Sequence, residues 1–273
     1  CSFDIEVRMK YVAFLDILGF KKKLNTFKTH NQAINYISKF SSIVYKEFKN
    51  LRETNSIKGY IVSDSVILYS TNSEFESLMS LISLINNICR AAFKENILIR
   101  GGLTKGHFDK VPVSELKNLE KGLIVGDAYV NALNQEGFVK AIGVTISKDV
   151  KEDLFKHNKS HDKSIDIDLI LLSNISSLKQ KNKEYYWFKY IDMDFLFNDD
   201  NLKKFIRMAV DSNYLPHYFN TLNFAVRNER NKQEIQKLFD QIVKTLNELG
   251  CNNEGLVSKF NKSVFVDKVY LES

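Results

Sequence analysis

The stretch YVAFLDILGFK, from Tyr11 to Lys21, decides the fold and poses the question of function. Apolar and aromatic residues run directly into Asp16, so a strand that is buried along most of its length ends on a carboxylate. A buried charge is costly unless it is paired or binds a cation. Asp16 therefore either sits at the exposed end of the strand, as a cap for the next segment of the chain, or is held there to bind a cation.

The composition of the 273-residue chain indicates an ordered globular protein with a sizeable core. Lys and Arg exceed Asp and Glu by 39 to 33, a net charge of +6. Solubilising surface lysines explain this excess better than a nucleic-acid groove does, and a polyanionic nucleotide would also suit it. Three cysteines without a CxxC pair indicate neither a disulfide framework nor a zinc site. With no apolar run long enough to span a bilayer, we expect a cytoplasmic protein without a membrane partner.

Strand and helix patterns alternate in the first half of the chain. The predicted elements, in chain order, are a strand at 11–17, a helix at 31–51, strands at 57–62 and 66–70, a helix at 73–93, a strand at 97–107, a strand and a helix within 122–136 and a strand at 139–147. Ser73 and Glu76 have the spacing of a capping box. The order β-α-β-β-α-β, then α-β, predicts an α+β fold, a ferredoxin-like α/β sandwich with additions.

Helical patterns dominate beyond about residue 199. The clearest runs from Asn228 to Leu249, with apolar residues on one face and Gly250 placed to stop the helix. We therefore predict a catalytic domain at 1–198 and a helical extension at 199–273 that serves as core packing or as a dimer element.

A second carboxylate, Asp64, lies at the tip of the hairpin that the short break between 57–62 and 66–70 predicts. In a ferredoxin-like sheet the first strand and this hairpin are neighbours, so Asp16 and Asp64 can face one point. A divalent ion such as Mg²⁺ would remove their repulsion, since it prefers one or two carboxylates together with phosphate oxygens and water. Asp64 taken alone is equally well explained as a turn residue.

Four motifs, in order, resemble those of the class III nucleotidyl cyclases, the adenylate and guanylate cyclase superfamily. They are FLDILGF, IVSDSVIL, IRGGLTKG and GDAYVNALNQE, within residues 10–147. VAFLDILGFK together with IRGG is most similar to the bacterial Pycsar pyrimidine cyclases, which act in antiphage defence. The resemblance implies a class III cyclase core with a C-terminal helical extension. It also implies a lyase that converts UTP, or CTP, to the 3′,5′-cyclic nucleotide and pyrophosphate.

The resemblance also implies roles for particular residues. Two Mg²⁺ or Mn²⁺ ions would be held by Asp16, the carbonyl of Ile17 and Asp64. The turn that continues through Leu18, Gly19 and Phe20 would bind phosphate through its backbone N–H groups. In this family each active site forms between two protomers, so a homodimer with composite sites is expected.

Two further positions bear on the base and the phosphates. Tyr60 stands where adenylate cyclases of the family place Lys and guanylate cyclases Glu, and its hydroxyl could bond a pyrimidine edge. Tyr is also common in strands for packing alone. Arg100 at a strand end can reach a phosphate or a base carbonyl, or form a surface salt bridge. Gly101 and Gly102, which follow it, would let backbone and ligand approach closely.

The last motif departs from the family pattern. Alignment on its Gly and Glu ends puts Val130 where the family has a transition-state Asn, and Asn134 where it has a phosphate-binding Arg. Sliding by one residue supplies Asn131 for the first role but no arginine for the second. A catalytically silent nucleotide-binding protein is therefore one alternative. A polymerase-like palm domain is another, because such a domain also uses a pair of aspartates.

Overall fold

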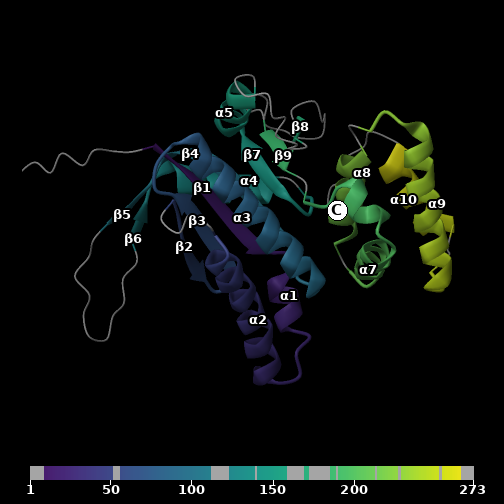
Figure 1. Cartoon of the computed structure of the whole chain (residues 1–273). Helices are drawn as coiled ribbons and strands as arrows, with labels where there is room; N and C mark the ends of the chain where they lie inside the picture. Colours follow the sequence, from purple (N-terminus) through teal and green to yellow (C-terminus); the bar gives the residue numbers. More distant parts are fainter. Residues whose placement is uncertain are drawn as a thin grey trace, which may run out of the picture. The chain divides into compact units, whose positions relative to one another are not determined.

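The computed structural model describes residues 9–51, 56–111, 123–138, 140–158, 169–171, 185–188, 190–212, 214–226, 229–251 and 254–265 (Figure 1). The chain gathers into two compact units. The first comprises residues 1–138 and 144–166, and the second comprises 139–143 and 167–273. The predicted functional boundary at residue 198 stays a prediction. No helix in the described ranges is both long enough and apolar enough to cross a membrane.

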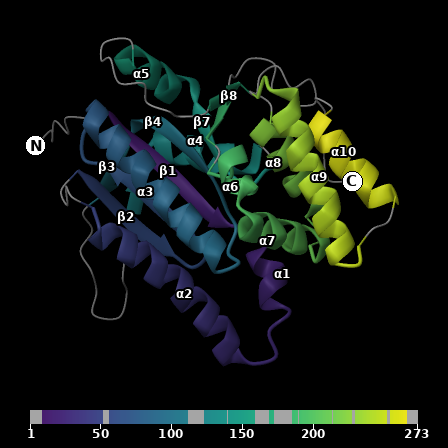
Figure 2. The same ribbon diagram turned by 45° about the vertical axis from the view of Figure 1, so that its right-hand side comes forward.

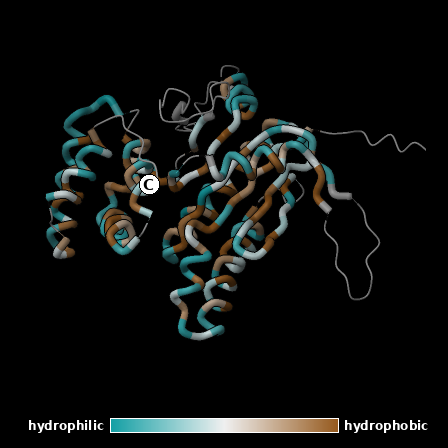
Figure 3. Tube along the Cα trace, turned by 180° about the vertical axis from the view of Figure 1, so that it is seen from behind, coloured by the Kyte–Doolittle hydropathy of each residue, from teal (hydrophilic) through white to brown (hydrophobic). Residues whose placement is uncertain are grey.

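A mixed sheet forms the centre of the first unit. The strands of the sheet that belong to this unit are β1 (Met9–Ile17), β2 (Ile57–Val62), β3 (Ser65–Ser70), β4 (Ile99–His107) and β7 (Val144–Ser147), in the order β2-β3-β1-β4-β7. β1 pairs antiparallel with both β3 and β4, and β4 pairs parallel with β7. A separate ribbon joins β5 (Asp109–Val111) to β6 (Leu123–Val125). Hydrophobic residues concentrate along the strands of this sheet (Figure 3).

Helices cover both faces of the sheet. They are α1 (Phe20–Leu24), α2 (His30–Lys49), α3 (Phe75–Lys94), α4 (Asp127–Phe138) and α5 (Lys148–Asn158). α2 and α3 lie on one face (Figure 2), whereas α4 packs on the other, against β1 and β4. Residues 11–15 of β1 are all buried, as expected for a strand covered on both sides. The predicted α+β sandwich is confirmed.

The start of α3 differs from the prediction. The helix begins at Phe75 after an N-cap at Glu74, and no side chain caps it, so the capping box expected at Ser73 is wrong. Instead the Asn72 side chain accepts a hydrogen bond from the N–H of Glu74 at 3.1 Å. Asn72, two residues before the N-cap Glu74, thus forms a side-chain turn that gives the N–H of Glu74 its acceptor. A capping box does form at Thr29 and Gln32, at the start of α2.

Gly102 lets α4 approach β4 closely. A Cβ atom at this position would lie 2.2 Å from the carbonyl oxygen of Ala132 and 2.7 Å from the Cβ of Gln135. Any other residue would therefore push the helix away from the sheet. The hydroxyl of Thr104, two residues along the same strand face, donates to the carbonyl of Ala128 at 2.7 Å and fastens the first turn of α4.

The second unit is mostly helical. Its elements are β8 (Leu169–Leu171), β9 (Tyr185–Phe188), α6 (Met193–Phe197), α7 (Asp199–Val210), α8 (Leu215–Val226), α9 (Lys232–Glu248) and α10 (Glu254–Phe265). α9 ends as predicted at Gly250, whose φ is +67°. The N–H groups of Gly250 and Cys251 donate to the carbonyls of Asn247 and Leu246, which is a Schellman ending.

α8 holds the connection between α4 and β7. The Asn220 side chain donates to the carbonyl of Lys140 at 2.7 Å, and the Thr221 hydroxyl accepts from the N–H of Ile142 at 2.9 Å. A Cβ at Gly143 would lie 2.2 Å from the indole nitrogen of Trp187, so the ring rests directly on this glycine. Residues 140–143 and these side chains all belong to the second unit. We call residues 140–143 the anchored segment.

We predict that Thr221→Val lowers the free energy of unfolding by about 1–3 kcal/mol, because the buried N–H of Ile142 loses its acceptor. Thr221→Ser keeps the hydroxyl and is the matched control. Urea unfolding followed by the fluorescence of Trp187, the single tryptophan of the chain, measures both variants. A smaller loss for Val than for Ser would show that the methyl group, and not the hydrogen bond, stabilises this connection.

Candidate active site

Cross-strand pairing places three polar residues side by side near one end of the sheet. Asp16 on β1 lies opposite Ser65 on β3 and opposite Arg100 on β4. Directly opposed residues of antiparallel strands point to the same face. Phe14, two residues before Asp16, shares that face and packs in one cluster with Ala132 of α4. The register of β1 therefore turns all three polar side chains toward the α4 side of the sheet.

The β2–β3 hairpin brings Asp64 to the end of β1. Val62 pairs with Ser65, so Ser63 and Asp64 form the loop, and Ser63 adopts a positive φ of 55°. The carbonyl of Asp64 accepts a hydrogen bond from the N–H of Ile17 at 3.2 Å. This bond holds the hairpin tip against the strand end that carries Asp16. The backbone of Asp64 thus lies next to that of Ile17, the residue that follows Asp16.

The environment of Asp16 is mixed. Burial raises the pKa of this carboxyl above its ordinary value, and the nearby charge of Asp64 raises it further. A hydrogen bond from the Ser65 hydroxyl at 2.9 Å, the charge of Arg100 and the N–H of Ile17 act in the opposite direction. The side chain keeps 20% of its surface exposed. The site therefore holds a carboxylate that burial and a like charge both oppose, which a bound cation would relieve.

Arg100 contacts two carboxylates. Its Nη2 lies 3.8 Å from Oδ2 of Asp16, while its Nε forms an ion pair with Oε1 of Glu136 on α4. The Glu136 side chain is only 10% exposed, and that of Arg100 is 21% exposed. The sequence predicts a phosphate contact or a surface salt bridge for Arg100. The ion pair that the structure shows is largely buried, and its acidic partner was not foreseen.

Glu136 and Ser65 are residues of this site that the sequence analysis did not assign. Ser65 was part of the hairpin, and Glu136 closed the last motif, but neither had a role. A signal for Glu136 was available, because Ala128, Ala132 and Gln135 precede it at helical spacing on the face that packs against the sheet. An acid on a buried helix face requires a partner.

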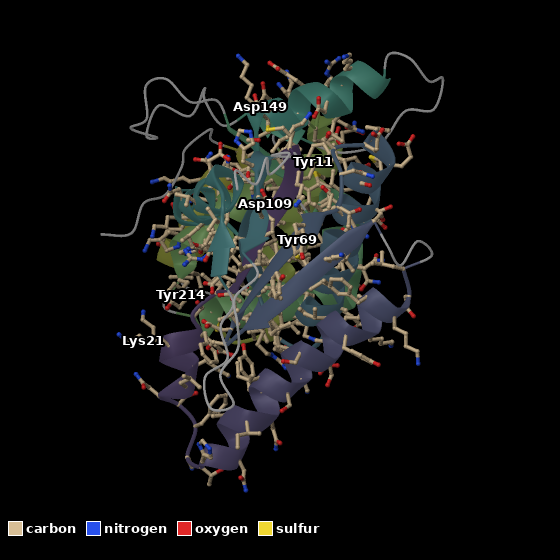
Figure 4. The ribbon with its side chains drawn as sticks, turned by 90° about the vertical axis from the view of Figure 1, so that its left-hand side faces the viewer. Tyr11, Lys21, Tyr69, Asp109, Asp149 and Tyr214 are labelled. Atoms are coloured by element: carbon tan, nitrogen blue, oxygen red, sulfur yellow. The ribbon has the colours of Figure 1, made fainter. Side chains whose placement is uncertain are left out.

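Tyr60 belongs to an aromatic group on the same sheet face. Its ring stacks on that of Tyr69 with centroids 5.8 Å apart, and the two hydroxyls are 3.3 Å apart. The ring of Phe108 lies 4.6 Å beyond Tyr69. Tyr69 lies over the central strands in Figure 4. Tyr60 therefore packs against Tyr69, as the sequence predicts for a tyrosine in a strand, and its phenol belongs to β2, the strand that leads to Asp64.

The other two residues predicted to bind substrate lie on the outer side of α4. Asn131 and Asn134 are exposed, as are Val130 and Leu133, whereas Ala132 is buried against the sheet. Within one chain the two asparagines therefore occupy the side of the helix away from the packed face. The structure puts Asp16, Arg100 and Tyr60 on one face of the sheet, with Asp64 in the loop beside the end of β1, but leaves these two asparagines on the exposed side of α4.

Two backbone N–H groups in the turn after β1 already donate hydrogen bonds to other parts of the protein. The N–H of Ile17 donates to Asp64, and the N–H of Leu18 donates to the carbonyl of Leu98 at 2.8 Å. Gly19 has a φ of 75° and precedes the five-residue helix α1, which begins at Phe20. Phosphate binding by the amides of Gly19 and Phe20 stays a prediction.

The donor set suits a hard divalent cation. Asp16 and Asp64 offer carboxylates from adjacent chain segments, and the Ile17 carbonyl follows Asp16 directly in the sequence. Within the described ranges, no group of three or more His, Cys, Asp or Glu side chains gathers as a complete metal cage. Mg²⁺ needs no such cage, because it commonly takes one or two carboxylates and completes its shell with phosphate oxygens and water.

The fold matches solved nucleotide cyclases. No family model matches the chain, and no curated protein matches its sequence. The guanylate cyclase domain of RhGC from Catenaria anguillulae, in complex with GTP, aligns with a TM-score of 0.50 and 18% identity over 67% of this chain and 97% of that one. The adenylyl cyclase CyaB from P. aeruginosa aligns with a TM-score of 0.51 and 13% identity over 67% and 94%. The chain therefore has the class III cyclase fold with additional C-terminal helices.

We predict that Asp16→Asn raises the free energy of unfolding at pH 7 in EDTA. Because the pKa of Asp16 in the folded protein lies above its ordinary value, the ionised carboxylate lowers stability, and this loss grows as the pH rises through the raised pKa. The neutral amide avoids it. Urea unfolding at a series of pH values from the acidic range up to pH 7 should show an advantage for the variant that increases with pH and is largest at pH 7. A variant less stable than wild type at pH 7 would contradict the electrostatics described here.

Proposed function

We propose that this chain is a metal-dependent pyrimidine nucleotide cyclase that converts UTP, in preference to CTP, to the 3′,5′-cyclic nucleotide and pyrophosphate. The observation that carries the proposal is the shared sheet face of Asp16, Arg100 and Tyr60, with Asp64 at its edge, on a class III cyclase fold. We further propose that the product is a second messenger in antiphage defence, as the likeness of VAFLDILGFK and IRGG to Pycsar cyclases implies.

The reaction joins the ribose 3′ oxygen to the α-phosphorus and breaks its bond to the pyrophosphate. Asp16, Asp64 and the Ile17 carbonyl are the groups that would hold Mg²⁺ or Mn²⁺. Bound ions supply activation of the 3′-hydroxyl and charge neutralisation at the phosphates. Ser65 orients Asp16 through its hydroxyl, which donates at 2.9 Å. Arg100, whose guanidinium lies beside Asp16, is the side chain we assign to the phosphates.

Tyr60 is the residue we assign to the base. The stack on Tyr69 fixes the plane of its ring, and the bond between the two hydroxyls directs its phenol. A fixed phenol can donate to, or accept from, the edge of a pyrimidine, and its bulk shortens the pocket for a purine. The preference for UTP over CTP rests on the family likeness.

We assign the outer side of α4 to a second copy of the chain. Asn131 and Asn134 face away from the packed side of the helix in their own protomer, so a composite site would give them a substrate to contact. Exposed apolar residues accompany them on α4 and on the hairpin that carries Asp64: Ile61, Val62, Val130 and Leu133. Such residues at both ends of a composite site fit an isologous dimer with two equivalent sites.

A catalytically silent nucleotide-binding protein is the second candidate. Asn134 stands where the family has an arginine that binds phosphate. An asparagine carries no positive charge, so it cannot offset the negative charge that develops on the phosphates during the reaction. Such a protein would bind UTP without turnover. A polymerase-like palm domain, the third candidate, would extend a primer instead of cyclising its substrate.

We predict that purified protein with Mn²⁺ forms cyclic nucleotide and pyrophosphate from UTP faster than from CTP, ATP or GTP. Asp64→Asn should reduce turnover by about a hundredfold or more, because a ligand of the ions is lost. Chromatography of the products with each nucleotide measures this. If UTP binds in calorimetry but no nucleotide is cyclised, the silent binder is the correct assignment, and primer extension would indicate the palm domain.

We also predict that two inactive chains restore activity when mixed. One carries Asp64→Ala, and the other carries changes at Val130, Asn131 and Asn134. A mixed dimer pairs one intact set of aspartates with one intact outer side of α4, so part of the cyclase activity should return. Native mass spectrometry would show that the subunits exchange. Exchange without any recovery would place each complete site within a single chain.

A further inference from the structure

Arg100 stands between two carboxylates that belong to different elements. Asp16 ends the buried strand β1, whereas Glu136 lies in the last turns of α4. The Nε of Arg100 pairs with Glu136, and its Nη2 is 3.8 Å from Asp16, near the outer limit of an ion pair. The guanidinium is thus held more closely by Glu136 than by Asp16.

This division of contacts affects how Asp16 can bind a cation. A guanidinium in direct contact would compete with a divalent ion for the same carboxylate oxygens and would repel that ion. Asp16, Asp64, Arg100 and Glu136 together carry a formal charge of −2. Without the charge of Glu136 the sum is −1, and Arg100 would be free to turn toward Asp16.

The placement of Glu136 depends on close packing. Gly102 allows α4 to lie directly against β4, where Ala132 and Gln135 contact it. Glu136 follows on the same packed side of the helix, and its side chain is 10% exposed. An acid in such a place is strongly destabilising without a partner, so its pairing with Arg100 is tightly determined.

We propose that Glu136 is a positioning residue that keeps Arg100 from closer contact with Asp16 than 3.8 Å and offsets its charge, so that Asp16 can bind a divalent cation. This inference rests on the metal site of the proposed function. Glu136 itself touches neither the ion nor the nucleotide in this arrangement. Its effect is exerted entirely through Arg100.

Mn²⁺ titration calorimetry of the full chain, without nucleotide, tests the proposal. Glu136→Gln keeps the shape of the side chain but removes its charge, and we expect Mn²⁺ affinity to fall about tenfold, as removal of one nearby charge would cause. The double variant Glu136→Gln with Arg100→Gln removes both charges and should regain affinity to within about threefold of wild type. Glu136→Asp should retain most of the affinity.

Asp153→Asn is the matched control. Asp153 also pairs with a β4 cation, Lys105, at 2.7 Å, with side-chain exposures of 26% and 22%. Lys105 is opposite Tyr11 in the register and so points to the other face of the sheet. Loss of this pair should leave Mn²⁺ affinity unchanged.

The outcomes separate this inference from the function on which it rests. Wild-type affinity in Glu136→Gln overturns it, and so does a double variant that binds as weakly as the single one, because Glu136 would then not act through Arg100. If Glu136→Gln does not fold by circular dichroism, the double variant decides, because it leaves neither buried charge without its partner: we expect it to bind Mn²⁺ to within about threefold of wild type, and weaker binding overturns the proposal. A wild-type chain that binds no Mn²⁺ refutes the metal site itself.

Discussion

The carboxylate of Asp16, at the end of a strand that is otherwise buried, is the constraint on which the rest of the site depends. Burial and the charge of Asp64 both oppose its ionisation. The hydroxyl of Ser65 and the guanidinium of Arg100 counter them, and each does so because strand register places it directly opposite Asp16. Arg100 in turn is a largely buried cation and requires an acid of its own. Glu136 meets that requirement.

The absence of a side chain at Gly102 connects this electrostatic network to the packing of the fold. A Cβ there would collide with the backbone of α4 at Ala132, so the helix would move outward and carry Glu136 with it. The glycine that the sequence analysis interpreted as room for a ligand thus also makes room for a helix. Both interpretations require another group to approach the backbone of this glycine closely. In the structure, the group that does so is the backbone of α4 at Ala132.

Local sequence patterns predicted the fold well because each depends on neighbouring residues alone. The apolar run that ends at Asp16, the short break around Asp64 and the stop at Gly250 all appear where expected. The Arg100–Glu136 pair could not be predicted in this way, because it joins a strand to a helix more than thirty residues later and requires the exact side of α4 that faces the sheet. The capping box at Ser73 failed because the helix begins one residue later than its spacing implies, with Glu74 as the N-cap and the N–H of Glu74 bonded to the Asn72 side chain.

Helix α4 carries residues of the proposed site on two of its sides. Its inner side carries Glu136 and fixes Arg100, while its outer side carries Asn131 and Asn134, which a composite site would use. The close packing at Gly102 and the pairing of Glu136 with Arg100 fix which side of α4 faces the sheet. Asn131 and Asn134 therefore stay on the exposed side of the helix within their own chain. In the cyclase proposed above, a second chain would be needed to bring substrate to them.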